Sequence, residues 1–214
     1  MKWQLLRAAH ITKTLMPDEG HAQTVIVMPS TDADQASRAA QQLASRATEC
    51  HAMILVVMDD EGEGFTDIVN RVYRATHSDY FGYVAQDAYA GRRWLPLALQ
   101  TLTQQHKGLL GFNDGKWGGA LAAFGLGQRS WLDHNYDGDI FFHGYTQHYA
   151  DTELTMLAIG NAQYCYNPNA VLVEVDWGKD AKAVQPFDRL LYAQRKLGWI
   201  KEHVTHPACL ELFS

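Results

Sequence analysis

Three short apolar segments alternate with helical patterns between residues 24 and 85, and this alternation restricts the fold more than any other feature of the chain. The segments cover residues 24–28, 53–58 and 80–85. Strands that are almost wholly apolar are typical of parallel sheets buried on both faces. We therefore predict an α/β fold, with a mostly parallel central sheet flanked by helices and right-handed crossovers. The apolar positions at helical spacing are Ala36, Ala39, Ala40, Leu43 and Ala47 in the first helix, and Phe65, Ile68, Val69 and Val72 in the second.

Polar residues follow each predicted strand. Pro29-Ser30-Thr31 stops the first strand, and Asp32 is a suitable N-cap for the next helix. Asp59-Asp60-Glu61-Gly62 ends the second strand, and Asp87 follows the third. In open α/β sheets, ligands bind at the edge where the strands end. Asp87 is therefore a candidate for binding a metal or a phosphate group, although it could also simply cap the next turn.

Several common functional classes are excluded by missing motifs. The first strand lacks a GxGxxG turn, and the chain contains neither GxxxxGK[ST] nor GxSxG. The net charge of −6 and the pI near 5.9 disfavour binding of bulk nucleic acid.

The cysteines and the N-terminal segment indicate the compartment. Cys50, Cys165 and Cys209 have no metal-site or disulfide spacing, so we expect reduced thiols. No secretory signal or membrane-spanning run is visible, and we expect a cytoplasmic protein.

The chain is predicted to form one domain over residues 1–214, with residues 1–22 as a peripheral N-terminal strand or arm. Residues 135–139 resemble a calcium loop only superficially, because the glycine is misplaced and position 12 would be Thr146, so we interpret them as a turn. Further elements are expected at 94–105 (helix), 108–112 (strand), 128–132 (short helix), 150–160 (helix), 170–175 (strand) and 186–200 (helix).

The order of these parts resembles the nucleotide-sugar-dependent glycosyltransferases of the A-type fold, in particular the large inverting family-two group. Four stretches between residues 24 and 175 are similar to the family's motifs: 27–31 (VMPST), 57–62 (VMDDEG), 70–87 (NRVYRA to YVAQD) and 149–154 (YADTEL). Two departures stand out. Ala85 replaces the first aspartate of the Asp-x-Asp metal motif, which leaves Asp87 as the only carboxylate of that motif. The family's late histidine lacks its usual sequence context here, and His203 or His206 could take its place.

The resemblance implies a glycosyltransferase that uses a nucleotide-diphosphate sugar, with UDP the expected nucleotide, and Mn²⁺ or Mg²⁺ as cofactor. It implies a nucleotide-binding half at 24–105 and an acceptor half with a C-terminal helix at 106–214. Asp151 would be the general base of an inverting transfer. The residues that would contact the donor are Pro29, Ser30, Thr31, Asp59, Asp60, Asn70, Gln86 and Asp87. The metal ion would be bound by Asp87 and His203. The acceptor side would be formed by Asn113, Asp114, Trp117 and Glu153.

Alternatives remain open for several of these residues. Asp151 could be only a helix N-cap, although no Glu or Gln at position 154 forms a capping box. Asn113 and Asp114 could only form the turn to Gly115. Four aromatic side chains could stack on a sugar or lie in the core: Trp117, Trp131, Phe142 and Tyr145. Two histidines, His143 and His148, are better explained by structural or surface roles than by metal binding.

Two other functions compete with the transferase. A sugar-nucleotidyltransferase has a similar fold, but it normally carries a glycine-rich basic loop where this chain has Pro29-Ser30-Thr31-Asp32. A non-catalytic nucleotide or sugar binding module would explain the degenerate motif Ala85-Gln86-Asp87.

Overall fold

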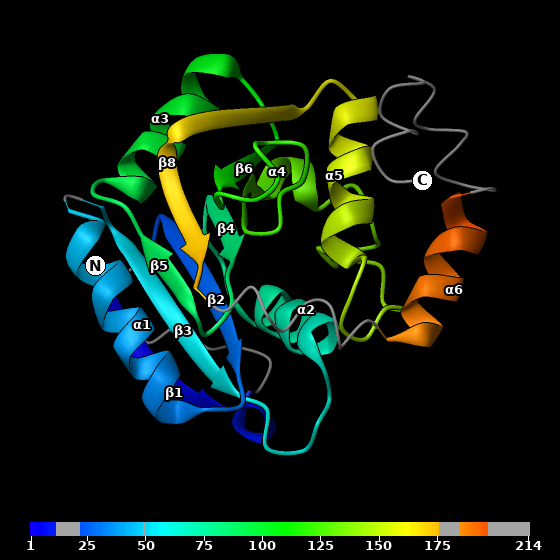
Figure 1. The fold of residues 1–214 in the computed structure, drawn as a ribbon, viewed down its shortest axis with the longest axis horizontal. Helices are drawn as coiled ribbons and strands as arrows, with labels where there is room; N and C mark the ends of the chain where they lie inside the picture. The colour runs from blue at the N-terminus through cyan, green and yellow to red at the C-terminus, as the bar shows by residue number, and fades with distance from the viewer. Residues whose placement is uncertain (12–21, 49, 176–184, 197–214) are drawn as a thin grey trace.

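The computed structural model of the chain describes residues 1–11, 22–48, 50–175 and 185–196, and its fold is drawn in Figure 1. Within these residues, eight strands form a sheet in the order β1-β3-β2-β4-β7-β6-β8-β5. The strands are β1 (Lys2–Arg7), β2 (Thr24–Ser30), β3 (Ala52–Met58), β4 (Tyr80–Tyr83), β5 (Ala88–Ala90), β6 (Leu109–Asn113), β7 (Gly125–Gln128) and β8 (Tyr164–Glu174). The helices are α1 (Ala33–Arg46), α2 (Phe65–Ala75), α3 (Trp94–Gln105), α4 (Arg129–Leu132), α5 (Ala150–Gly160) and α6 (Pro186–Arg195), with a 3-10 turn at Ala8–His10.

The N-terminal half has the predicted parallel arrangement. Strand β2 lies between β3 and β4 and pairs in parallel with both, so Thr24 is in register with Ala52 on one side and Tyr80 on the other. Helices α1 and α2 make the two crossovers. The predicted α/β class with a mostly parallel sheet is confirmed, and β4 ends at Tyr83, slightly earlier than the apolar run suggests.

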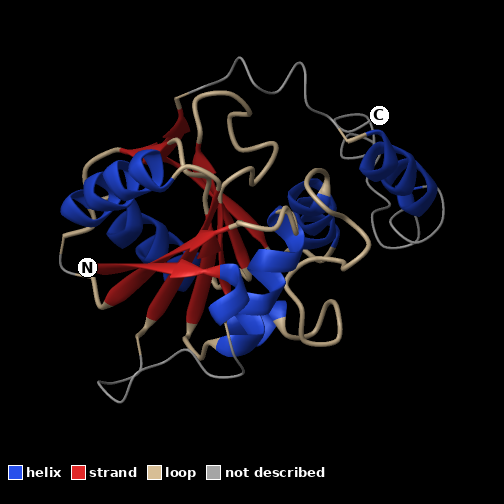
Figure 2. Cartoon of the chain, turned by 90° about the horizontal axis from the view of Figure 1, so that it is seen from below, coloured by secondary structure: helices blue, strands red, loops and turns tan. Residues whose placement is uncertain are grey.

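Helices cover both faces of this sheet (Figure 2). On one face, α1 and α3 bury an apolar cluster that includes Leu43, Trp94 and Phe112. The Trp94 indole nitrogen donates to the Leu43 carbonyl oxygen at 3.0 Å, so this buried polar group is satisfied. On the other face, α2 and α5 bury a second cluster around Val69 and Leu154. The central strands β2, β3 and β4 are therefore buried on both faces, as their apolar sequences predict.

Helix α1 has the predicted N-cap and apolar stripe. The Asp32 carboxylate accepts hydrogen bonds from the backbone N–H groups of Asp34 and Gln35 at 3.0 and 2.9 Å. The predicted core positions of this helix are all buried, and Leu43 is fully so. The pattern and the cap together fix where the helix begins and which face it buries.

Shortening the Leu43 side chain should destabilise the fold without touching any candidate site residue. Because Leu43 is fully buried, we expect Leu43→Ala to lower the free energy of unfolding by about 2–5 kcal/mol. Urea denaturation followed by circular dichroism measures this change. Gln41→Ala, at an exposed position of the same helix, is the control and should change stability by less than about 0.5 kcal/mol. A similar loss in both variants would contradict the assigned core.

Strand β7 was not predicted, because two of its four residues are glycines. The structure explains them. An added Cβ at Gly125 would lie 2.5 Å from the Tyr83 hydroxyl oxygen, and one at Gly127 would lie 2.7 Å from Leu132 Cδ1. The strand pairs antiparallel with β4 and with β6, so it interrupts the parallel pattern in the middle of the sheet.

The pairing of β5 with β8 also differs from the expectation. The sequence predicts no element between Asp87 and the helix at 94–105, but Ala88–Ala90 form a short strand antiparallel to the end of β8. Strand β8 begins at Tyr164, well before the predicted 170–175 segment. Its first part pairs in parallel with β6 and its last part pairs with β5. This long strand carries Glu174 to the edge of the sheet beside Asp87.

Residues 2–7 of the predicted N-terminal arm form the edge strand β1, which pairs in parallel with β3. The predicted turn at 135–139 is confirmed: Asp137 and Gly138 both have positive φ, and Tyr136 and Asp139 form a bridge. Among the described residues, no helix has the length and apolar character needed to cross a membrane. The last predicted helix is described only to Arg195, and residues 197–214 lie outside the described part.

The cysteines fit the expected reduced state where the structure describes them. Cys50 is half-buried and Cys165 is buried, and neither forms a disulfide. Burial raises the pKa of the Cys165 thiol to about 11, so it is protonated at neutral pH and poorly reactive. Cys209 lies outside the described residues.

Candidate functional site

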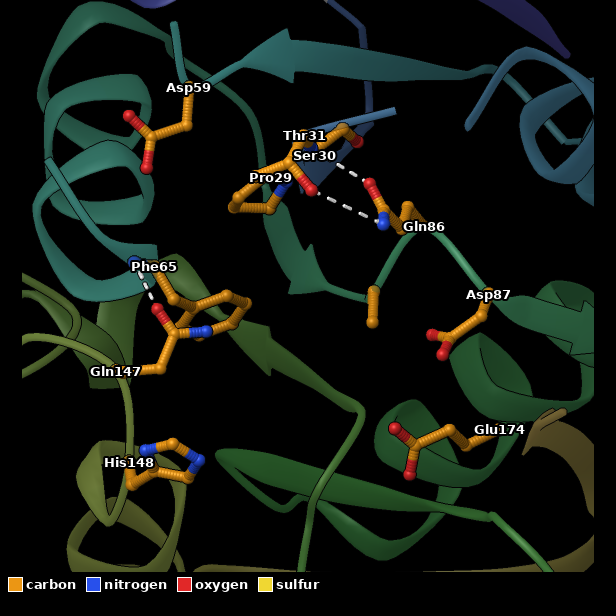
Figure 3. Close-up of a pocket in the computed structure, with 11 residues that line it drawn as sticks. Pro29, Ser30, Thr31, Asp59, Phe65, Gln86, Asp87, Gln147, His148 and Glu174 are labelled. Carbon is orange, nitrogen blue, oxygen red and sulfur yellow. Dashed lines mark hydrogen bonds between the residues drawn. The ribbon is translucent and has the colours of Figure 1, made fainter. Parts of the chain in front are cut away.

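A cleft of about 400 Å³ opens at the carboxyl ends of β2, β3 and β4 (Figure 3). This is the edge at which the sequence predicts a site, and it is where open α/β sheets bind ligands. The cleft brings together residues from both halves of the chain. Its lining residues are Pro29, Ser30, Thr31, Asp59, Phe65, Ala85, Gln86, Asp87, Gln147, His148 and Glu174.

The loop after β2 and the turn after β4 are joined by Gln86. Its side-chain oxygen accepts hydrogen bonds from the backbone N–H groups of Thr31 and Asp32 at 2.8 and 3.1 Å. Gln86 therefore holds the loop that begins at Pro29 next to Asp87. Its amide is engaged by the chain itself, so it shapes the cleft rather than projecting a free group into it.

The Asp59 carboxylate closes the turn between β3 and α2. Its two oxygens accept hydrogen bonds from the backbone N–H groups of Glu63 and Gly64 at 2.8 and 3.0 Å. Gly64 has a φ of 96°, and an added Cβ would lie 2.6 Å from the Thr146 carbonyl oxygen, so only glycine fits there. The neighbouring Asp60 lies outside the cleft and pairs with Arg7 at 3.4 Å.

Asp87 and Glu174 supply carboxylates to the same wall of the cleft (Figure 3). Asp87 is 6% exposed and lies in the turn between β4 and β5. Ala88 pairs with Glu174, and the Val175 N–H donates to the Asp87 carbonyl oxygen at 3.2 Å, so their backbones are neighbours. Asp87 does not cap the following helix, because Arg93 is at the N-cap of α3. Two carboxylates on one wall give an oxygen-rich, anionic region.

The opposite wall is formed by Gln147 and His148, in the segment before α5 (Figure 3). Asp188 of α6 holds this segment: its carboxylate accepts from the backbone N–H groups of Thr146, Gln147 and His148 at 3.0, 2.8 and 2.9 Å. Burial alone would raise the pKa of Asp188, but these hydrogen bonds outweigh it and hold the pKa below its usual 3.8.

The lowered pKa of Asp188 predicts a pH dependence of stability. A folded-state pKa below the unfolded value stabilises the fold above pH 3.8, and the contribution is lost as pH falls through the folded pKa. We therefore expect the stability advantage of the native chain over Asp188→Asn to be constant near neutrality and to shrink below about pH 4. Urea denaturation of both proteins between pH 3 and 7 measures this difference. A difference independent of pH over the whole range would contradict the assigned contacts.

Asp151 lies in the first turn of α5, outside the set that lines the cleft. The helix begins at Ala150 with Tyr149 at the N-cap, so the alternative that Asp151 is the N-cap is wrong. Its Oδ1 accepts from the Thr152 N–H at 2.8 Å. Burial, and secondly the charge of Asp151, raise the pKa of Tyr83, whose ring contacts Phe65 in the cleft wall. Asp151 is therefore near Tyr83, which packs against the cleft residue Phe65.

Asn70 and Glu153 are placed in the core. Asn70 is 1% exposed, and its amide exchanges two hydrogen bonds with the Phe141 backbone. Glu153 is fully buried, and its oxygens accept from Tyr136, Tyr145 and Arg195 at 2.6–2.9 Å. Both side chains hold elements together, and the structure does not bring them to the cleft.

Asn113 and Asp114 form the turn that follows β6. Asn113 accepts from the Gly115 N–H, and Asp114 accepts from the N–H groups of Lys116 and Trp117. Trp117 is 43% exposed, so it is not a core aromatic, whereas Tyr145 is fully buried as a core side chain. Asn113, Asp114 and Trp117 lie outside the cleft lining.

Five cleft residues were not among the predicted site residues: Phe65, Ala85, Gln147, His148 and Glu174. The sequence indicates a structural or surface role for His148, and nothing near Glu174 marks it as a site residue, because the pairing of β5 with β8 has no local signal. His203, the predicted second metal ligand, lies outside the described residues. Within the described residues, no group of three or more His, Cys, Asp or Glu side chains could hold a metal ion.

Comparison with family models gives no match, and comparison with curated proteins gives none either. Solved structures do match. The mannosyltransferase PcManGT from Pyrobaculum calidifontis, in complex with GDP-Man and Mn²⁺, superposes with a TM-score of 0.55 at 14% identity, covering 96% of this chain and 78% of that one. Glucosyl-3-phosphoglycerate synthase from Mycobacterium tuberculosis, in complex with Mg²⁺ and UDP, superposes with a TM-score of 0.54 at 11% identity, covering 87% of this chain and 80% of that one.

S. aureus TarS gives a TM-score of 0.55 at 12% identity, over 70% of this chain, and the chain spans only 36% of the TarS chain. At these identities the likeness concerns the fold. The mostly parallel sheet flanked by helices is consistent with this likeness. The chain has the A-type fold of the nucleotide-sugar glycosyltransferases.

Proposed function

We propose that this protein is a glycosyltransferase that moves a sugar from a nucleotide-diphosphate sugar to an acceptor hydroxyl with inversion. The observation that carries the proposal is the cleft at the carboxyl edge of an A-type sheet, with Asp59 and the Pro29–Thr31 loop on one side and Asp87 and Glu174 on another. A cleft of about 400 Å³ is within the size range of small-ligand sites.

The nucleoside would lie between Asp59 and the loop that begins at Pro29. Carboxylate oxygens accept hydrogen bonds from a base or from ribose hydroxyls, and Asp59 is held in place by its two backbone contacts. UDP and GDP-Man are bound in the solved structures compared above, and a uridine diphosphate is our first choice for this chain. Gln86 would act indirectly, by fixing the Thr31 loop.

The donor set suits a divalent cation. Mg²⁺ and Mn²⁺ prefer oxygen ligands, and such ions are commonly held by one or two carboxylates together with substrate phosphates. Asp87 and Glu174 provide two carboxylates on one wall, so they would hold the ion jointly with the diphosphate of the donor. When bound, the ion would neutralise the charge that develops on the leaving diphosphate.

Asp151 is the proposed general base. The acceptor oxygen would attack the anomeric carbon, the bond from that carbon to the diphosphate oxygen would break, and the hydroxyl proton would pass to the Asp151 carboxylate. The position of Asp151 on α5, three residues after His148 in the cleft wall, supports this role. Asn113, Asp114 and the exposed Trp117 would lie on the acceptor side.

One observation favours the non-catalytic alternative. The Ala85 methyl group lines the cleft where the Asp-x-Asp motif would place a carboxylate, so the site could bind a nucleotide sugar without activating it. No observation favours the nucleotidyltransferase, because the loop after β2 has Pro29-Ser30-Thr31 in place of a glycine-rich basic loop.

Donor hydrolysis tests the proposed activity without knowledge of the acceptor. Purified protein is incubated with UDP-glucose or GDP-mannose and Mn²⁺, and release of the nucleoside diphosphate is followed against EDTA-treated samples. We expect slow, metal-dependent release, since water can replace the acceptor hydroxyl. Tight binding of a nucleotide sugar without any release would instead identify the binding module.

A further inference from the structure

Helix α6 contacts one continuous stretch of chain, residues 146–153, through three side chains on one of its faces. These side chains are Asp188, Tyr192 and Arg195, spaced four and three residues apart as on one face of a helix. The opposite face is exposed, with Phe187 at 63% and Leu190 at 65%. Figure 1 shows α6 at the edge of the molecule near the start of α5.

The three contacts follow the stretch from one end to the other. Asp188 is fully buried and accepts from three consecutive backbone N–H groups at 146–148 and from the Thr146 hydroxyl at 3.1 Å. The Tyr192 ring stacks on Tyr149 with centroids 4.8 Å apart. At the far end, Arg195 donates to both oxygens of Glu153 at 2.7 and 2.6 Å.

The same stretch is fixed to the donor side of the cleft. The Thr146 carbonyl oxygen accepts from the Thr66 N–H at 3.1 Å, and the Gln147 side-chain oxygen accepts from the Phe65 N–H at 3.3 Å. The Gln185 N–H donates to His148 Nδ1 at 3.4 Å. Gln147 and His148 are thereby held in fixed orientations on the wall opposite Asp87 and Glu174.

We propose that Asp188 is a positioning residue of the donor site, which sets Gln147 and His148 as the wall that contacts the sugar and diphosphate of a bound nucleotide sugar. This inference rests on the proposed function. Its physical basis is the loss that follows removal of the carboxylate: three N–H groups of one turn would lose a charged acceptor, and the turn would rearrange to satisfy them. The cleft would then lose one wall while Asp59, Asp87 and Glu174 stay in place.

The experiment combines a binding measurement with a mutant cycle. Isothermal titration of UDP-glucose and GDP-mannose with Mn²⁺ is carried out on the native chain, Asp188→Asn, His148→Ala and the double variant. Leu190→Ala, exposed on the same helix, is the control. Amide hydrogen exchange of residues 146–148 is measured in the same proteins without any ligand. Thr146→Val, which removes only the hydroxyl contact to Asp188, replaces Asp188→Asn if that variant does not fold.

We expect Asp188→Asn to weaken binding of the nucleotide sugar about tenfold, comparable to the loss of one hydrogen bond to a charged group. Thr146→Val should weaken it about two- to threefold, near the low end for one hydrogen bond. Amide hydrogen exchange at residues 146–148 should become faster in Asp188→Asn. The double variant should bind the nucleotide sugar no more weakly than the weaker-binding of the two single variants, because loss of Asp188 already removes the contribution of His148.

Two results would overturn the inference: Asp188→Asn binding like the control, or additive losses in the double variant. Failure of the proposed function is distinguishable from both, because in that case the native chain itself would bind no nucleotide sugar, while the exchange data would still report on the contacts of Asp188.

Discussion

Asp87→Ala is expected to abolish metal-dependent nucleotide binding, with affinity falling at least about a hundredfold, since the ion contributes several kcal/mol of charge neutralisation. The physical reason is the position of Asp87 in the turn after β4, on the cleft wall that it shares with Glu174. Titration of the nucleotide diphosphate with and without Mn²⁺ separates the metal-dependent part of the affinity from the rest.

The control for this variant is Asp34→Ala, which removes an exposed carboxylate from the first turn of α1. It should bind like the native chain. Glu174→Gln should show a smaller loss than Asp87→Ala, because one carboxylate remains together with the diphosphate oxygens. Retention of Mn²⁺-dependent binding in Asp87→Ala would remove Asp87 from the metal site.

Asp151→Asn is expected to lower the turnover of donor hydrolysis by about 10²–10⁴-fold, the usual contribution of a general base. Binding of the nucleotide sugar should stay unchanged, because Asp151 lies outside the cleft lining and takes part only when a hydroxyl or water is deprotonated. Initial rates of nucleotide release, with parallel titrations of donor binding, give both quantities.

A matched control for this variant is Asp137→Asn, which removes an exposed carboxylate in the turn at 135–139. If Asp151→Asn hydrolyses the donor at the native rate, another group must be the base. If it loses donor binding instead, Asp151 has a role in shaping the cleft rather than in proton transfer.

The first half of the fold was predictable because its signals are local. The apolar strands around Val27 and Val56, the helix capped by Asp32 and the polar residues after each strand all lie within windows that periodicity and capping describe. Since parallel strands end at the same sheet edge, the same signals predict that Pro29, Asp59 and Asp87 meet, and the structure brings them to one cleft.

The rest of the site depends on pairings with no local signal. Glu174 reaches Asp87 only because β8 continues past β6 to pair with β5, and nothing near residue 174 indicates this. His148 reaches the cleft because Asp188, forty residues later, binds its backbone. Glu153 looked like a site residue from its motif, but the tyrosines and Arg195 that bury it come from distant parts of the chain.

The central claim is that the cleft at the carboxyl edge of β2, β3 and β4 binds a nucleotide-diphosphate sugar. The most direct test is isothermal titration of the purified chain with UDP, GDP and their sugar conjugates, each with and without Mn²⁺. We predict saturable binding of one nucleotide diphosphate that requires the metal and disappears in Asp87→Ala. A folded protein that binds no member of this panel would contradict the claim.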